Sequence, residues 1–187
     1  MVKVVELETE RLNLRQWKDS DYPVFAEMSS DPEVMEFYPK VLSENESNEI
    51  ANKIHTLIAK RGWGFWAVER KENNQFIGFV GLHEPVPELP FSPCVEIGWR
   101  LGKEHWGKGY ATEAAKESLK YAFESLKLGN VVSFATVGNK RSRAVMERLN
   151  MVNTYRNFEH PELPVGSPLR EHVLYELTKE RWNETAV

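Results

Sequence analysis

The residues with the clearest chemical potential form a glycine turn, His105-Trp106-Gly107-Lys108-Gly109-Tyr110-Ala111-Thr112-Glu113-Ala114. Two glycines one residue apart let the backbone turn tightly and approach a ligand without interference from Cβ atoms. A helical pattern begins directly after them, so the turn leads into backbone amides that have no partner within the helix. This arrangement predicts a site for a phosphate or pyrophosphate, with a glycine turn that holds no ligand as the alternative.

Other kinds of site fit the sequence poorly. A P-loop motif is absent, and Thr112 stands where a dinucleotide-binding turn needs a third glycine or alanine. The next predicted strand, Val131 to Val137, also lacks the acidic residue of that fold. Cys94 follows Pro93 at a strand start, which favours a small buried residue over a nucleophile. We expect no metal site, because the five histidines show no ligand spacing: His55, His83, His105, His160 and His172.

The glycine turn must be positioned by the elements on either side of it. A strand is predicted for Cys94 to Leu101, and a helix with one apolar stripe for Tyr110 to Leu126, with Gly129 as its stop. The remaining predicted strands are Thr9–Trp17, Trp63–Glu69, Gln75–His83, Val131–Val137, Tyr155–Glu159 and Val173–Leu177. Three further helices are predicted: a short one after Asp19-Ser20-Asp21, one over Ser43–Arg61 and one over Asn139–Leu149.

The composition is that of an ordinary globular protein. The chain has 187 residues, 41% of them hydrophobic, and 24 basic against 28 acidic residues give a net charge of −4. This balance argues against a general nucleic-acid binder, and the longest nearly apolar run is too short to span a membrane. Met1 to Glu6 lacks the apolar core of a signal peptide. We therefore expect one domain over residues 1–187, in the cytoplasm, without a nucleic-acid or membrane partner.

Over about residues 8 to 178 the chain resembles the GNAT N-acetyltransferase superfamily. Gly107 to Ala114 is similar to that superfamily's acetyl-CoA pyrophosphate loop, and Val95 to Leu101 to the strand before it. Asn139 to Leu149 is similar to the second cofactor-contacting helix. Glu8 to Arg15 resembles the start of the branch that contains ribosomal-protein N-terminal (alanine or serine) acetyltransferases.

The resemblance implies a fold and a cofactor site. The implied fold is α+β, with a mixed, mostly antiparallel sheet of about seven strands, flanked by about four helices and splayed at the cofactor site. Backbone groups of the splayed strand would bind the pantetheine arm of acetyl-CoA, and the loop amides its pyrophosphate. The implied cofactor-binding residues are Trp99, Arg100, Leu101, Gly107, Lys108, Gly109, Tyr110, Ala111, Thr112, Asn139 and Ser142.

The proton-transfer groups are less defined. Met146 stands where many family members have a Tyr that acts as general acid, and a thioether donates no proton. We expect Glu96 to be the general base, because a carboxylate among apolar strand residues has a raised pKa. The alternatives are a structural Glu96–Arg100 pair, and Glu159 as base. Ser142 is the candidate donor to the leaving thiolate, with an ordinary helix serine as the alternative.

The predicted function is acetyl-CoA-dependent N-acetyl transfer by direct attack of an amine. The branch suggests a protein N-terminal amine as acceptor. The alternatives are a polyamine, amino acid or drug as acceptor, or a non-catalytic acyl-CoA sensor. Two loops are expected to hold the acceptor: Met35 to Leu42, and His160 to Arg170 with the nearby acids Glu159, Glu162 and Glu171. A monomer and a homodimer both remain open.

Overall fold

The structure is a computed structural model that describes residues 2–185. Met1, the first residue of the stretch compared with a signal peptide, lies outside the described residues, and so do residues 186–187 at the end of the expected domain. The chain divides into two compact units, one of residues 1–82 with 98–118 and one of residues 83–97 with 119–187. Strand β5 (Glu96–Leu101) and helix α3 (Tyr110–Lys120) each contribute residues to both. That the chain forms one domain stays a prediction.

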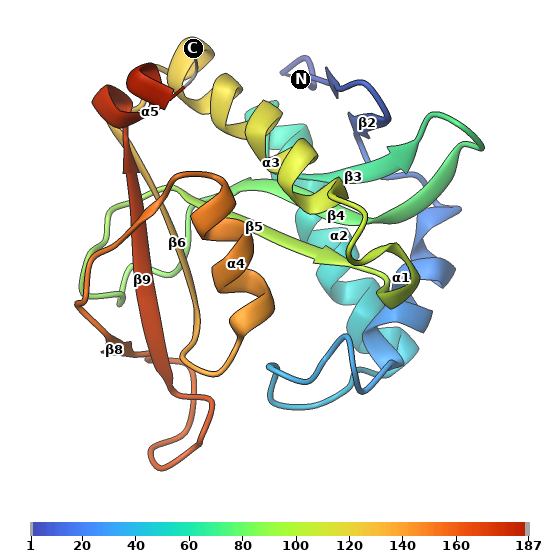
Figure 1. Ribbon diagram of the computed structural model, residues 1–187. Helices are drawn as coiled ribbons and strands as arrows, with labels where there is room; N and C mark the ends of the chain where they lie inside the picture. Colours follow the sequence, from blue (N-terminus) through green and yellow to red (C-terminus); the bar gives the residue numbers. More distant parts are fainter. Residues whose placement is uncertain (1, 186–187) are drawn as a thin grey trace. The chain divides into compact units, whose positions relative to one another are not determined.

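The first unit combines antiparallel strands with two complete helices and most of α3 (Figure 1). Its strands follow the order β1-β2-β3-β4-β5. Helices α1 (Asp21–Ser30) and α2 (Glu44–Arg61) lie side by side. The remaining bounds are β1 (Leu7–Glu8), β2 (Leu12–Arg15), β3 (Phe65–Arg70) and β4 (Gln75–His83).

The backbones of β4 and β5 approach closely at Gly78. This glycine has φ of +132°, and a Cβ built there would lie 2.1 Å from the Arg100 carbonyl oxygen. The Gly102 amide donates to the Ile77 carbonyl beside it, at 3.0 Å. A glycine at position 78 therefore lets β5 lie directly against β4.

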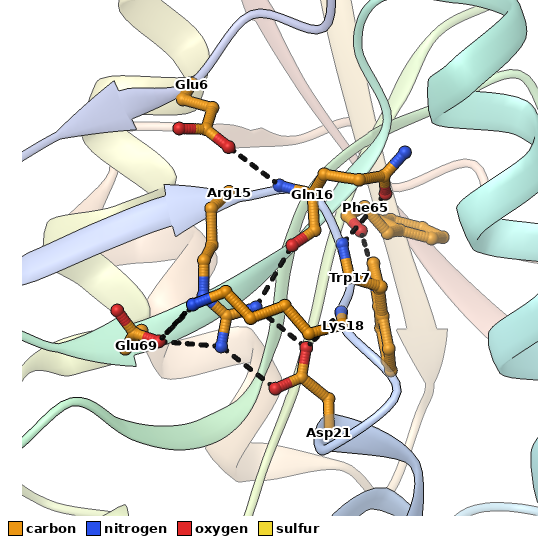
Figure 2. Close-up of polar contacts among 8 residues, drawn as sticks. All are labelled: Glu6, Arg15, Gln16, Trp17, Lys18, Asp21, Phe65 and Glu69. Carbon is orange, nitrogen blue, oxygen red and sulfur yellow. Dashed lines mark hydrogen bonds and ion pairs between the residues drawn. The ribbon is translucent and has the colours of Figure 1, made fainter.

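A buried polar network fixes α1 against the strands (Figure 2). Arg15 on β2 donates to both carboxylate oxygens of Asp21 at 2.7 and 2.9 Å and to Glu69 on β3 at 2.8 Å. Burial on its own would lower the pKa of Arg15, but its hydrogen bonds and the charges of the two carboxylates raise it. Next to the network, Trp17 donates from Nε1 to the Phe65 carbonyl at 2.9 Å and packs edge-on against Phe25 of α1.

The second unit is built around β6 (Asn130–Thr136) and β9 (Glu171–Thr178). They pair antiparallel from Asn130↔Thr178 to Thr136↔His172, and the start of β5 pairs parallel with β6 at Glu96↔Val132. Strands β7 (Val152–Asn153) and β8 (Phe158–Glu159) both pair with β9. Helix α4 (Lys140–Arg148) follows β6, and α5 (Lys179–Thr185) follows β9.

The predicted fold class is confirmed, because the chain is α+β with mostly antiparallel strands and one parallel pair. Residues 2–185 contain nine strands and five α-helices, where about seven and four were expected. The additional elements are the short strands β1 and β7 and the terminal helix α5. No helix within residues 2–185 is long and apolar enough to cross a membrane.

Three local predictions need correction. The helix predicted to Leu126 is α-helical only to Lys120 and continues as a π-helix over Tyr121–Ser125. Lys127, with φ of +57°, adopts the left-handed conformation expected of Gly129. The strand predicted over Tyr155 to Glu159 shrinks to Phe158–Glu159, because Tyr155 is left-handed at φ +55° and therefore cannot extend the strand.

Candidate active site

The glycine turn has the backbone shape that a phosphate cradle requires. Gly107 and Gly109 have φ of +71° and +80°, and a Cβ at Gly107 would meet no atom within 4 Å. Helix α3 follows directly, and its Glu113 amide donates to the Gly109 carbonyl at 2.9 Å. The amides from Tyr110 to Thr112 precede that bond, so they are the free first-turn donors of the helix. These features fit a pyrophosphate group.

Arg11, which directly precedes β2, holds this turn in place. The Arg11 guanidinium donates to Glu113 on α3 at 2.7 Å and to the Lys108 carbonyl at 3.0 Å. The Arg11 amide and the Thr9 hydroxyl also donate to Glu113, at 2.9 and 2.5 Å. Burial on its own would raise the pKa of Glu113, but these hydrogen bonds outweigh it and lower the pKa. We call Thr9, Arg11, Lys108 and Glu113 the loop clamp.

The surroundings of the turn carry positive charge. The guanidinium groups of Arg11 and Arg70 lie 4.6 and 5.7 Å from the ring centre of Tyr110. Burial lowers the pKa of His105, and the charges of Lys108 and Arg70 lower it further, against the opposing effect of Glu104. A cradle with this charge favours an anion, which is the same conclusion that its free amides support.

Arg100 on β5 has an unusual environment. The residue is 9% exposed, and its Nε and Nη1 atoms are buried without a hydrogen-bond partner. Its Cζ atom lies 4.2 Å from the ring centre of Tyr38 and 5.5 Å from those of Phe25 and Phe79. A buried donor without a partner costs about 1–3 kcal/mol, so the aromatic contacts offset only part of the cost of burying this group. The alternative considered for Glu96, a structural pair with Arg100, is not made by the Nε and Nη1 donors.

Glu96 begins β5 and has the electrostatics expected of a general base. The residue keeps some exposed surface, but burial of its carboxyl group raises the pKa to about 8. A carboxylate with a pKa this close to neutral can accept a proton from an amine far better than an ordinary one. The same charge contributes to Cys94, where burial first and Glu96 second raise the pKa of the thiol to about 11. Cys94 is therefore a poor nucleophile at neutral pH.

The residues predicted on α4 have specific local roles. The Asn139 side chain caps α4 by accepting from the Ser142 amide at 3.1 Å. Ser142 is partly buried in the first turn of α4, and Met146 is almost completely buried at 1% exposure. Asn150 adopts a left-handed conformation after the helix, with φ of +60°. The side-chain oxygen of Asn139 is thus engaged in capping.

Two acids at the second predicted acceptor loop are already engaged by other side chains. Glu159 is exposed and accepts from the Arg170 guanidinium at 3.0 Å. Glu171 accepts from Asn157 at 2.9 Å. The Glu159 carboxylate is therefore already engaged by an arginine. This environment supports Glu96 over Glu159 as the base.

The predicted site residues fall into two groups. The first unit holds Trp99, Arg100 and Leu101 together with the turn from Gly107 to Thr112. The second unit holds Glu96, Asn139, Ser142 and Glu159.

The sequence analysis did not predict the roles of Arg11 and Tyr38 or the environment of the Arg100 side chain. The one available signal was an arginine in the otherwise apolar stretch Ile97-Gly98-Trp99-Arg100-Leu101. Among residues 2–185, no group of three or more His, Cys, Asp or Glu is placed to hold a metal ion.

Comparison with known families decides what kind of protein carries this cradle. Residues 11–152 match the family model described as the acetyltransferase (GNAT) domain. The chain belongs to the GNAT acetyltransferase family. A GNAT acetyltransferase is an acyltransferase, so the predicted enzyme class is confirmed. The match includes the glycine turn, β5 and α4.

Relatives and solved structures agree with this membership. The chain is 31% identical over 188 residues to the FsC-acetyl coenzyme A-N(2)-transacetylase of Aspergillus fumigatus, covering 94% of this chain and 77% of that one. A GNAT-family acetyltransferase structure from Bacillus anthracis superimposes with a TM-score of 0.78 at 27% identity, covering 94% and 99% of the two chains. The ribosomal-protein-S5-alanine acetyltransferase of Vibrio fischeri shares the fold, with a TM-score of 0.73 at 20% identity over 95% and 98% of the chains. The expected resemblance to the GNAT superfamily is confirmed.

Proposed function

We propose that this GNAT acetyltransferase uses acetyl-CoA to acetylate an amine by direct attack, without a covalent enzyme intermediate. The observation that carries the proposal is the preformed cradle at Gly107 to Thr112, with its free amides and positive surroundings. The fungal relative, whose name includes acetyl coenzyme A as donor, supports the same choice. Acetyl-CoA would supply an activated thioester, whose acetyl carbon forms a bond to the amine nitrogen as its bond to sulfur breaks.

The chain's own residues then have two tasks. The amides of Gly107 to Thr112 bind the pyrophosphate, and backbone groups of Trp99 to Leu101 and the Asn139 side chain bind the pantetheine arm. Glu96 accepts the proton that the amine loses, and Ser142 or solvent returns a proton to the departing thiolate. Met146 takes no part in proton transfer, because it carries no acidic hydrogen.

The acceptor in this proposal is a protein N-terminal amine, which the branch resemblance supports. A small amine such as a polyamine, an amino acid or a drug is the second candidate. A mass-spectrometric screen with purified protein, acetyl-CoA, N-terminal peptides and small amines separates them. Release of CoA thiol with a peptide but not with small amines supports the first candidate. Binding of CoA without any turnover would contradict the proposed catalysis.

The cradle assignment is tested by Gly109→Val. The added side chain blocks phosphate approach, so we expect a CoA dissociation constant at least about tenfold higher in calorimetry. Gly166→Val is a matched control, because Gly166 also has a left-handed φ (+83° against +80°); a Cβ would lie 3.4 Å from Arg11 Nη2 at position 109 and would meet nothing within 4 Å at position 166. Equal CoA affinity in the two variants would contradict the assignment.

The role of Glu96 is tested by Glu96→Gln. We expect kcat to fall by about 10²–10⁴ while CoA still binds. Because the pKa of Glu96 in the folded protein is about 8, the wild-type rate should rise with pH through that value and level off above it.

Burial makes the Glu96 carboxyl group favour its protonated form, so the stability of the wild-type protein should fall as pH rises from 4.5 to 8. Full activity in Glu96→Gln with loss in Glu159→Gln would move the role to Glu159.

A further inference from the structure

The Arg100 side chain combines three properties that a purely structural arginine does not need. It is nine-tenths buried, it is permanently charged, and its Nε and Nη1 donors have no partner. Folding usually pairs a buried guanidinium with a carboxylate, because an unpaired one loses its hydration without compensation. The fold instead leaves these buried donors without an acceptor.

The aromatic rings around Arg100 define what kind of group would complete the site. Tyr38, Phe25 and Phe79 attract the positive charge through their ring faces, but ring faces do not replace hydrogen-bond acceptors for in-plane N–H groups. Nε and Nη1 point to different edges of the guanidinium plane, so an anion oxygen would bind at either one of them. A carboxylate supplies the charge and such an oxygen, and an apolar cage strengthens the interaction by excluding water.

The location connects this guanidinium with acceptor binding. Tyr38 belongs to the loop from Met35 to Leu42, one of the two loops expected to hold the acceptor, and it makes the closest ring contact to Arg100. The loop is anchored in place by the Tyr38 amide, which donates to Met35, and by the Leu42 amide, which donates to Ser29 of α1 at 2.8 Å. Tyr38 itself is 36% exposed, so it stands at the boundary between the cage and solvent.

We propose that Arg100 is a specificity-determining residue that binds a carboxylate of the acceptor, within the cage of Phe25, Tyr38 and Phe79. The proposal rests on the proposed N-acetyltransferase function and narrows its substrate class to amines that also carry a carboxylate. Two sources share this chemistry: a small amino acid, and a peptide with an acidic residue close to its free N-terminus. Arg100 acts by holding the acceptor and takes no proton from it.

Matched acceptor pairs test the proposal. The small-molecule arm compares γ-aminobutyrate with its amide and glycylglycine with its amide. The peptide arm compares Ala-Asp-Ala-amide with Ala-Asn-Ala-amide. Each pair keeps the amine and replaces a carboxylate by a carboxamide. In at least one arm we expect wild-type kcat/KM to favour the acid by about tenfold or more, mainly through KM. The arm that shows the preference identifies the source.

Three variants assign the preference to Arg100. Arg100→Met should abolish it, so that kcat/KM becomes about equal for the acid and its carboxamide in the pair that wild type distinguishes. Arg100→Lys should restore part of it, since the positive charge remains but the fixed directions of the guanidinium donors are lost. Arg156→Met, at an exposed arginine, should keep the wild-type preference. No acid preference in any wild-type pair, or a preference that persists in Arg100→Met, overturns the proposal.

A binding measurement keeps this test separate from the proposed function. If no amine is acetylated, the proposed catalysis fails, and thermal unfolding with γ-acetamidobutyrate and its amide still tests Arg100. The carboxylate should raise the wild-type Tm more than the amide does, and it should not do so in Arg100→Met. Equal shifts in the two proteins overturn the carboxylate site. Without ligand, Arg100→Met should unfold at the same or a higher temperature than wild type, because it removes an unpaired buried charge.

Discussion

Two arginines are buried to almost the same degree in the first unit, yet they meet opposite surroundings. Arg15 is 6% exposed and donates to Asp21, Glu69 and the Gln16 carbonyl. Arg100 is 9% exposed, and its Nε and Nη1 donate to nothing. The first is a polar joint between strands and α1 (Figure 2), whereas the second is enclosed by aromatic rings. The degree of burial alone therefore does not distinguish a structural arginine from one that is free to bind a ligand; the hydrogen-bond partners do.

The largest expected effect is the loss of stability in Arg15→Met. Removing Arg15 leaves the buried carboxylates of Asp21 and Glu69 without their main partner, which should cost about 3–5 kcal/mol in the free energy of unfolding. Urea unfolding of Arg15→Met beside Arg100→Met measures the contrast directly. Equal destabilisation of the two variants would show that the difference in partners has no energetic meaning.

A smaller effect should appear in the pH dependence of stability. Burial would raise the pKa of Glu69, but hydrogen bonding and the charge of Arg15 outweigh it and lower the pKa below its usual 4.5. Glu69 therefore contributes stability that is present above pH 4.5 and is lost as pH falls through the lower folded pKa. In Arg15→Met this acid-induced loss should disappear or reverse. Chemical unfolding between pH 3 and 7 checks the sign, and an unchanged pH profile in the variant contradicts it.

The smallest expected effect concerns the ring that faces Arg100 from the acceptor loop. Tyr38→Leu removes a cation–π contact of about 1 kcal/mol, so kcat/KM for carboxylate acceptors should fall by about fivefold. Stability should change little, because Tyr38 is partly exposed. Tyr155→Leu is the control, since Tyr155 is 87% exposed. A fall in kcat/KM of equal size for carboxamide acceptors would contradict a role in holding the guanidinium.

Features that depend on neighbouring residues were predictable from the sequence. The helix predicted from Ser43 begins there, with a capping box in which the Ser43 side chain accepts from the Glu46 amide while Glu46 accepts in return. Gly107, Gly109 and Asn150 adopt the left-handed conformations that their residue types favour. The Asn139 cap of α4 is equally local. Each of these depends on a few consecutive residues, so one sequence contains the necessary information.

Features that depend on distant pairing were not predictable in the same way. Arg11 and Glu113 are 102 residues apart, and no pattern in the sequence selects that pair among the many charged residues. The missing partners of Arg100 are harder still to predict. The sequence contains several acids, but none of them accepts a hydrogen bond from the buried Nε and Nη1 donors. Short strands such as β1 and β7 contain two residues each, which is too few for an alternating pattern to be visible.

The loop clamp has a consequence for the speed of cofactor capture. Arg11 and Glu113 already hold the turn in its left-handed glycine conformation, so binding an anion there requires little reordering of the backbone. Association should then be limited by diffusional encounter, which the nearby positive side chains accelerate and added salt slows. Loosening the clamp would make capture wait for the turn to form, and the association rate constant would fall before any contact to the phosphate had been removed.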